Sequence, residues 1–489
     1  MKRSGWLLLG GYALITLVFV CFHEPWRDEL QAWLIARHLR IVDIWHEMRY
    51  EGHFAWWFLM LRIGAAAGWP VWTMNLFSWA LCLGAAWLLV ARSPFRRWEQ
   101  AAILASAGML YWFPAVARCY ALIPPLLFAL AAAWPERRLH PWRIGILTAL
   151  LTQTHAYMEG LAAMIFLDAA IGWFQTPRGE ARRRAAGAMA VMALGALIGF
   201  LQVWPAFQCA SGANFTPLPD AAAWYARLLK IAASFAAGFG GGEALWGAAA
   251  PVMVWLCWLV PLAALAALAA VSRRAAWIAA GGWLWQFGFA FFLYEYIPQR
   301  SALVVLLLVF GAWIALAETA PGGLRQRLLR GALAGTVLLT IPGGIAIAAA
   351  DLRHPYSGLR DAGRFLDREV PPSFPVFLYP YSDGTVPAAA YAPRHVFFSL
   401  VGRRPCPFYH RAKGDIASVC FAPEFLELAL AEPLPDTFIL LTGGDYFPEG
   451  DAGAPFEHAG YRFRQMYRTP YVSLEPEEEP FRIYFVQRR

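Results

Sequence analysis

Seven side chains that could carry out acid–base or metal chemistry lie close together near the start of the chain. They are His23, Glu24, Arg27, Asp28, Glu29, Glu51 and His53. A carboxylate can take a proton from an attacking group, an arginine can stabilise an anionic leaving group, and histidines and carboxylates can bind a divalent metal. The same stretch is rich in tryptophan, which favours the interface between a bilayer and water. These residues therefore predict a polar site at a membrane surface.

Two adjacent carboxylates are the candidates for the base. Asp28 is the predicted catalytic base, and Glu29 is the second candidate. Together with His53 they are also the predicted ligands if the site holds a divalent metal. No tight ligand spacing requires a metal, so a divalent metal is a possible cofactor and no cofactor is certain. The alternative interpretation is that both carboxylates are simply solvated in an exposed loop.

The composition is that of a polytopic membrane protein. Of 489 residues, 59% are hydrophobic and only 15% are charged, against about 25% in soluble proteins. The net charge of +8 is unevenly spread, because residues 351–489 hold 15 basic and 18 acidic residues. The positive excess thus lies in the apolar part, where it indicates membrane topology. We expect the lipid bilayer as a partner and no nucleic acid.

Apolar segments separated by basic clusters predict about 11 transmembrane helices. Six clusters hold 17 of the 26 basic residues in the first 350 positions, and an even number of spans between clusters places all of them in the cytoplasm. The N-terminus is then cytoplasmic and the C-terminal region is periplasmic or extracellular. The predicted spans are 6–22, 71–91, 99–117, 119–134, 143–156, 157–174, 187–205, 248–271, 276–297, 300–318 and 332–350.

The first external loop, residues 23–70, carries the polar cluster. Two segments in it are predicted to lie along the interface as juxtamembrane helices: 28–39, which is amphipathic, and 53–68, which is apolar enough to be a span. Counting 53–68 as a span would move the next basic cluster to the outer side. The two helices would form a shelf with Asp28 and Glu29 at its edge.

Two domains follow from the change in composition, a transmembrane domain at 1–350 and a soluble domain at 351–489. In the second, a helix is expected from Ser357 to Glu369, with strands at 376–379 and 437–441, so a small α/β domain is predicted. Cys406 and Cys420 both fall in it, and an oxidising compartment would allow a disulfide between them.

The pattern around the acidic pair resembles the GT-C superfamily of integral-membrane glycosyltransferases. The resemblance rests on one span, the sequence Trp26 to Glu29, the following Ala-Trp-Leu-Ile-Ala-Arg segment, and the sequence Tyr50 to His53. It is closest to the bacterial protein O-mannosyltransferase and lipid A aminoarabinose transferase group, and it covers residues 1–205 best. That group has two juxtamembrane helices in the first external loop and an acidic base there. It uses a polyprenyl-phosphate sugar as donor.

The resemblance implies a role for other polar residues that the predicted topology brings to the same face. The candidates for substrate binding are Glu51, His53, Arg118, Tyr120, His155 and Arg300. Guanidinium groups match phosphate oxygens, so Arg300 and Arg118 are expected to hold the carrier phosphate. The structural alternatives are that Arg118 extends to the interface from a helix end and that Arg300 pairs with Glu295.

The predicted function is therefore a glycosyltransferase (EC 2.4) in the bacterial inner membrane. It would move a sugar from a polyprenyl-phosphate donor to an envelope glycan, lipid or protein acceptor on the periplasmic face. Two other classes stay open, a polytopic transporter and a non-catalytic scaffold of envelope biosynthesis. A transporter should place polar residues near the bilayer midplane with internal symmetry, whereas here they gather at one face.

Overall fold

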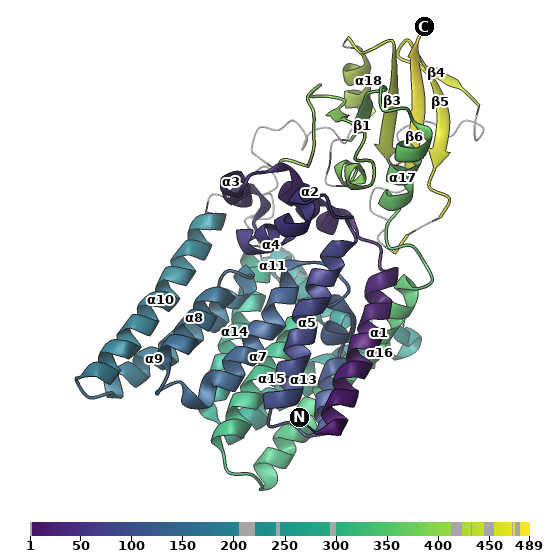
Figure 1. Ribbon diagram of the computed structural model, residues 1–489. Coiled ribbons are helices and arrows are strands. Elements are labelled where there is room, and N and C mark those ends of the chain that lie inside the picture. The colour runs from purple at the N-terminus through teal and green to yellow at the C-terminus, as the bar shows by residue number, and fades with distance from the viewer. Residues whose placement is uncertain are drawn as a thin grey trace.

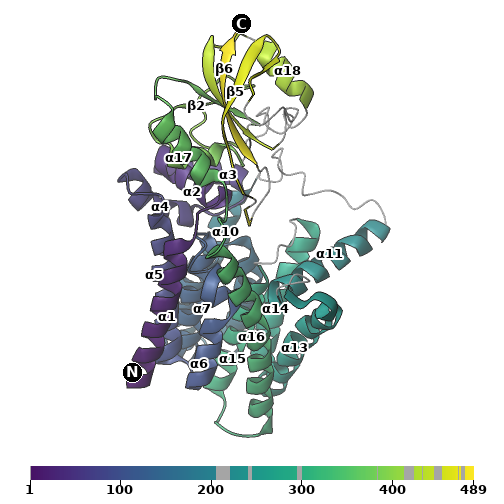
Figure 2. The same ribbon diagram turned by 90° about the vertical axis from the view of Figure 1, so that its right-hand side faces the viewer.

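The chain forms a bundle of long helices capped at one end by a smaller domain with a β-sheet (Figure 1). This computed structural model describes residues 2–204, 221–240, 245–293, 300–380, 382, 384–411, 423–431, 433–444, 454–471, 473–474 and 480–489. The N-terminus lies at the far end of the bundle and the C-terminus lies in the sheet domain, as a second view also shows (Figure 2). The two ends are therefore on opposite sides of the bundle.

Eight helical segments of the described chain are long and apolar enough to cross a membrane. Each overlaps a predicted span, so the polytopic class is confirmed, whereas the count of eleven is not established. They are α1 (Arg3–Phe22), α5 (Thr73–Arg92), Cys119–Glu136 containing α7 (Ile123–Ala133), Ala156–Gln175 containing α9 (Glu159–Gln175), α10 (Glu180–Val203), Gly247–Val271 containing α13 (Ala250–Val271), α15 (Ser301–Glu318) and α16 (Leu324–Asp351). Further helices are α6 (Arg97–Ala105), α8 (Pro141–Leu151), α11 (Ala221–Gly240) and α14 (Arg273–Phe292).

The predicted span at 99–117 is not one continuous helix. Helix α6 ends before Ser106, and a single π-helical turn at Gly108–Trp112 follows. The backbone N–H of Ala107 donates to the Thr340 hydroxyl of α16 at 3.3 Å instead of to a carbonyl within its own helix. Helix α16 comes this close because Gly344 has no side chain, and a Cβ there would meet the Cα of Ala107 at 2.6 Å. The break turns the following residues toward the candidate site.

The predicted span at 143–156 is also too long. Its helix, α8, has 11 residues and ends at Leu151. The next residues form a turn, and a short 3-10 helix at Ala156–Met158 then leads into α9. His155 therefore lies in a turn between helices.

The first external loop contains three helices where two were predicted. They are α2 (Arg27–His38), α3 (Ile41–Glu51) and α4 (Ala55–Ala66), and they lie between the bundle and the sheet domain (Figure 1). Helices α2 and α4 match the predicted juxtamembrane helices. Helix α3 was missed, and it ends at Gly52, whose φ of 68° suits glycine.

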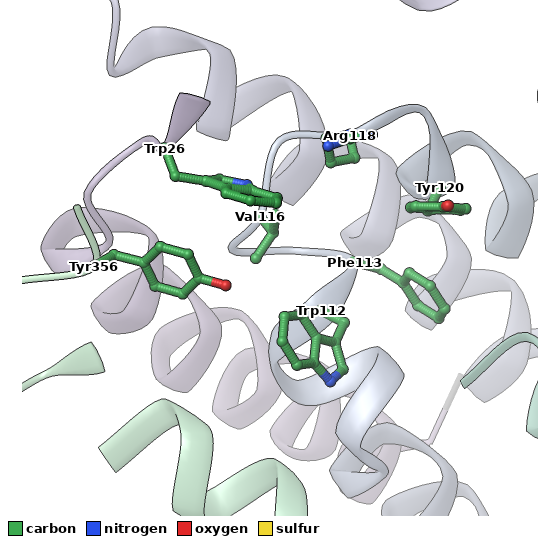
Figure 3. Close-up of a pocket in the computed structure, with 7 residues that line it drawn as sticks. All are labelled: Trp26, Trp112, Phe113, Val116, Arg118, Tyr120 and Tyr356. Carbon is green, nitrogen blue, oxygen red and sulfur yellow. The ribbon is translucent and has the colours of Figure 1, made fainter. Parts of the chain in front are cut away.

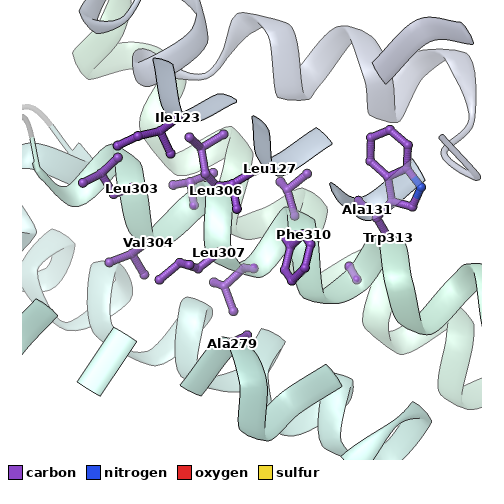
Figure 4. Packing of buried hydrophobic residues seen from close by; sticks show 14 of the residues in the cluster. Ile123, Leu127, Ala131, Ala279, Leu303, Val304, Leu306, Leu307, Phe310 and Trp313 are labelled. Atoms are coloured by element: carbon purple, nitrogen blue, oxygen red, sulfur yellow. The ribbon is translucent and has the colours of Figure 1, made fainter. Parts of the chain in front are cut away.

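The bundle is organised around α15, in which every residue from Ser301 to Leu316 is buried. Figure 4 shows its side chains packed between α7 and α14. A helix that is apolar on all sides fits only where neighbours surround it. Helix α15 thus holds Arg300, at its start, in a fixed place.

The C-terminal domain is an α/β unit, as predicted. Its helices are α17 (Leu359–Glu369) and α18 (Pro423–Ala431), and the Ser357 hydroxyl accepts the N–H of Leu359 at 3.2 Å. The mixed sheet has the order β2-β1-β3-β6-β5-β4. The strands are β1 (Val376–Tyr379), β2 (Phe397–Ser399), β3 (Thr437–Gly443), β4 (Phe456–His458), β5 (Tyr461–Arg468) and β6 (Phe481–Arg488). Strands β1 and β3 coincide with the two predicted strands.

Candidate active site

An ion pair between Asp28 and Arg118 lies where the bundle meets the juxtamembrane helices. Asp28 is in the first turn of α2, and Arg118 directly precedes the 3-10 turn Cys119–Leu122. The Arg118 guanidinium donates to Asp28 Oδ2, and the Arg27 Nε is 3.9 Å from Asp28 Oδ1. Burial opposes ionisation of Asp28, but the charges of Arg118 and Arg27 outweigh it and hold its pKa below the usual range. Asp28 is thus an ionised carboxylate that keeps 25% of its side chain exposed.

An aromatic pocket opens beside this ion pair (Figure 3). It encloses about 410 Å³ of empty space, part of which is open to solvent. Arg118 is the charged residue of its lining, and the π-helical turn contributes Trp112. The lining is formed by Trp26, Trp112, Phe113, Val116, Arg118, Tyr120 and Tyr356. An apolar wall with one guanidinium at its rim suits a molecule that joins a hydrocarbon chain to an anion.

The second predicted cation, Arg300, lies on the other side of Tyr120. Its Nε donates to the Tyr120 hydroxyl at 3.3 Å, and its guanidinium carbon is 5.1 Å from the centre of the Tyr157 ring. Arg300 is only 4% exposed. Tyr120 therefore links the two arginines predicted to bind phosphate.

Two histidines complete this part of the site. The His155 ring stacks on Tyr120 and on Tyr157, with centroids 4.9 and 4.7 Å apart, and the His53 ring is 5.8 Å away. Burial, reinforced by the charge of Arg118, lowers the pKa of His53 to about 3. Burial, with His53 and the charges of Arg300 and Arg118 nearby, also lowers the pKa of His155 well below its usual value. Both rings are therefore neutral at pH 7 and can donate or accept hydrogen bonds.

Glu51 faces the C-terminal domain. One of its oxygens accepts the Gln31 amide at 3.0 Å, and the other is 3.5 Å from the Nε of Arg411. Burial raises the pKa of Glu51 to about 7, although Arg411 and Gln31 act against this shift. The first-loop shelf and the C-terminal domain thus meet at a buried polar contact.

Glu29 is directed away from the pocket and is completely buried. One carboxylate oxygen accepts the Asn75 amide at 3.2 Å and the Ala117 N–H at 2.5 Å. The other accepts the Trp26 N–H at 3.2 Å and lies 2.9 Å from His23 Nε2. With its lone pairs used by the fold, Glu29 is poorly placed to take a proton from a substrate, and Asp28 is the better candidate for the base.

His23 joins two carboxylates behind the site, an arrangement that sequence reasoning missed. Its Nδ1 is 2.9 Å from Asp351 Oδ2, at the end of α16, and the Tyr111 hydroxyl donates to the same oxygen at 2.8 Å. Burial opposes protonation of His23, but Glu29 and Asp351 raise its pKa to about 10. A protonated His23 thus holds α16 against the start of α2.

The predicted metal ligands do not form one cluster in the described part of the chain. The donor atoms of His53, Cys119 and His155 lie within 4.8 Å of one another. His155 Nδ1 already accepts the N–H of Tyr157 at 3.1 Å, and Arg118 and Arg300 add positive charge nearby. A metal at the site stays a prediction. Of the predicted disulfide pair, Cys406 is buried and carries a free thiol, and Cys420 lies outside the described residues.

These features define the class of the fold: it is an ArnT-like fold, in line with the resemblance in the sequence. Two crystal structures of ArnT from Cupriavidus metallidurans are similar to this chain, covering 99% of it and 98% of their own length at 13% sequence identity. The TM-score is 0.53 for ArnT bound to undecaprenyl phosphate and 0.54 for the apo state. No protein-family model and no curated protein matches the chain.

Proposed function

We propose that the protein transfers a sugar from a polyprenyl-phosphate carrier to an acceptor in the bacterial envelope. The observation that carries the proposal is the Asp28–Arg118 ion pair at the rim of the aromatic pocket. The pocket offers an apolar surface for the first part of a polyprenyl chain, and the similar fold of ArnT binds undecaprenyl phosphate. Arg118 and Arg300 supply the charge that stabilises the released phosphate.

The ion pair also suggests how Asp28 becomes a base at the right moment. In the free enzyme, Arg118 keeps the pKa of Asp28 low and its basicity weak. When the carrier phosphate binds Arg118, it competes with Asp28 for the guanidinium, and the pKa of Asp28 rises. Asp28 then takes the proton of the acceptor hydroxyl while the bond between sugar and phosphate breaks.

The remaining residues have supporting roles in this proposal. The neutral His53 and His155 rings and the Tyr120 hydroxyl provide hydrogen bonds for the sugar. We expect inversion at the anomeric carbon, because one base activates the acceptor for direct displacement. In this proposal the site faces the periplasm and the N-terminus lies in the cytoplasm.

The geometry argues against the two alternative classes. A scaffold that had lost its chemistry would have no reason to keep Asp28 paired with Arg118 beside His155 and Arg300. In a transporter, polar residues should lie near the membrane midplane, but Asp28 is in the first turn of α2, which lies at the end of the bundle next to the sheet domain (Figure 1).

The test is a mass profile of envelope glycans and polyprenyl-phosphate sugars in a deletion strain. We expect the strain to lack a sugar on one envelope component and to accumulate the carrier form of that sugar. The wild-type gene should restore the profile, and Asp28→Asn should not. An unchanged profile after deletion would overturn the proposed function, and full restoration by Asp28→Asn would overturn the assignment of the base.

A further inference from the structure

A segment of the C-terminal domain is built into the wall of the candidate site. The Gln31 side-chain amide donates to the carbonyl of Tyr409 at 2.6 Å and accepts the Tyr409 N–H at 3.0 Å. This pair of bonds imitates one rung of a β-ladder. Gln31 is 2% exposed and lies one helical turn after Asp28, so the contact fixes Tyr409 relative to the proposed base.

The same segment is anchored on the sheet at its other end. The N–H of Cys406 donates to the carbonyl of Phe397 in β2 at 2.9 Å. His410, next to Tyr409, lies 3.3 Å from Glu47 of α3 through its Nδ1. Residues 406–411 therefore contact both the sheet and the helices of the first external loop. Arg411 lies where these two parts meet.

Arg411 contacts the site from a direction different from that of Arg118 and Arg300. It pairs with Glu51 at 3.5 Å, with 22% of the Arg411 side chain exposed and 4% of the Glu51 side chain. Glu51 also accepts the amide of Gln31, one helical turn after Asp28, so Arg411 shares a buried partner with the helix that carries the proposed base. Arg411 does not line the aromatic pocket. Arg118 and Arg300 are on the bundle, whereas Arg411 comes from the soluble domain.

We propose that Arg411 determines acceptor specificity by binding an anionic group, a phosphate or a carboxylate, next to the acceptor hydroxyl. The inference rests on the proposed function. It deepens that function by assigning a substrate class and a role for the C-terminal domain. Glu51 holds the guanidinium when no acceptor is present, and the acceptor anion takes its place.

The exchange is favourable because of how the two partners are buried. Glu51 is almost enclosed, and burial makes its charged form costly, so it can lose its pairing by taking up a proton. Arg411 keeps 22% of its side chain exposed, and the planar fork of a guanidinium fits phosphate or carboxylate. An anion from solvent can therefore reach Arg411 without unfolding the contact between the domains.

The experiment uses extracts of the deletion strain, so neither substrate needs to be known. Its lipid extract supplies the accumulated carrier-linked sugar, and its envelope fraction supplies the acceptor. The purified full-length protein is tested with the envelope fraction as extracted, after phosphatase treatment and after methyl esterification of carboxylates. Transfer is measured by mass spectrometry, and binding of undecaprenyl phosphate is measured separately.

We expect Arg411→Gln to raise the acceptor concentration needed for half-maximal transfer by about 10- to 100-fold, as for loss of a charge-assisted bond. Its affinity for undecaprenyl phosphate should stay that of wild type, whereas Arg118→Gln should lose it. Glu51→Gln should lower the acceptor requirement, because it removes the carboxylate that competes with the acceptor anion for Arg411. The matched control is Arg394→Gln, an exposed arginine of the same domain paired with Asp367.

The treated acceptors identify the anion. With wild type, phosphatase treatment should raise the acceptor concentration needed for half-maximal transfer if the group is a phosphate. Methyl esterification should raise it if the group is a carboxylate. The inference is overturned if Arg411→Gln behaves as Arg394→Gln, if Glu51→Gln and Arg411→Gln have the same effect, or if neither treatment changes transfer. Failure of wild type to transfer any sugar between the extracts would instead overturn the proposed function.

Discussion

Two groups of charged residues lie back to back at the start of α2, and they are built differently. Asp28 and Arg118 form a pair that keeps part of each side chain exposed beside an aromatic pocket. His23, Glu29 and Asp351 form a network in which the side chains are 0–3% exposed. Adjacent residues of a helix point about 100° apart, so Asp28 faces the pocket and Glu29 faces the interior.

The difference distinguishes a group that can react, Asp28, from a group that stabilises the fold, Glu29. A reacting group must be able to exchange its partner, which Asp28 can do because its main partner is one accessible guanidinium. Glu29 contacts four donors at once, and removing any of them would leave a buried polar group unsatisfied. The N–H of Ala117, next to Arg118, is one of those donors, so the buried network positions the ion pair in front of it.

The sharpest test of this comparison is Asp28→Asn. The amide keeps the shape of the side chain but is not a base, so we expect transfer to fall by about 10²- to 10⁴-fold. The thermal unfolding midpoint in detergent should fall only slightly, because the Asp28–Arg118 pair is partly exposed and screened by solvent. A large loss of stability would mean that Asp28 belongs with the supporting network.

Glu29→Gln should lower the stability of the protein more than its rate of transfer, the reverse of Asp28→Asn. It leaves the protonated His23 with one carboxylate in place of two, and breaking a buried pair costs about 3–5 kcal/mol. We expect a clear drop in the unfolding midpoint and in the amount of protein in the membrane. Transfer per folded molecule should fall far less than in Asp28→Asn, and equal losses in the two variants would contradict the division of roles.

The supporting network should also make stability depend on pH. Folding raises the pKa of His23 from 6.5 to about 10, so its contribution is fully present below pH 6.5 and is lost as the pH rises toward 10. Unfolding at a series of pH values should show this decline in wild type. In His23→Gln the decline should be smaller, and an unchanged curve would show that His23 is not the titrating group.

The smallest effect is expected at the other end of the bundle. Asp168 of α9 is 3.0 Å from Arg274 and 3.8 Å from Arg137, and Arg137 also pairs with Glu318. Because Arg137 keeps a partner and Arg274 is 36% exposed, Asp168→Asn should cost less than about 1 kcal/mol. Transfer should be unchanged. A loss of transfer would show that the two ends of the bundle are coupled.

The sequence predicted features with a local signal. Apolar length located most of the spans, an amphipathic face located α2, the parity of the basic clusters located α4, and short apolar runs located β1 and β3. It failed where a distant contact decides the local structure. Helix α6 ends near Ser106 because Thr340 of α16 takes the N–H of Ala107, and 233 positions separate the two residues.

The same limit applies to the site. Asp28, Arg118, Tyr120, His155 and Arg300 could be proposed because each lies near the end of a predicted span, and the fold brings them together. Arg411 and Asp351 have no such signal, since each is more than 300 positions from its partner. The choice between Asp28 and Glu29 also needed the structure, because it depends on the rotation of α2 about its axis.

The joint between Gln31 and Tyr409 has a consequence for the order in which the protein is made. The ribosome releases Asp28 and Arg118 long before residues 406–411. Those residues are hydrogen-bonded to β2 through Cys406. The sheet that contains β2 is completed only when β6 enters between β3 and β5. A chain still being synthesised thus has its proposed base but not Arg411. We expect such a chain to bind its acceptor weakly until the sheet is complete.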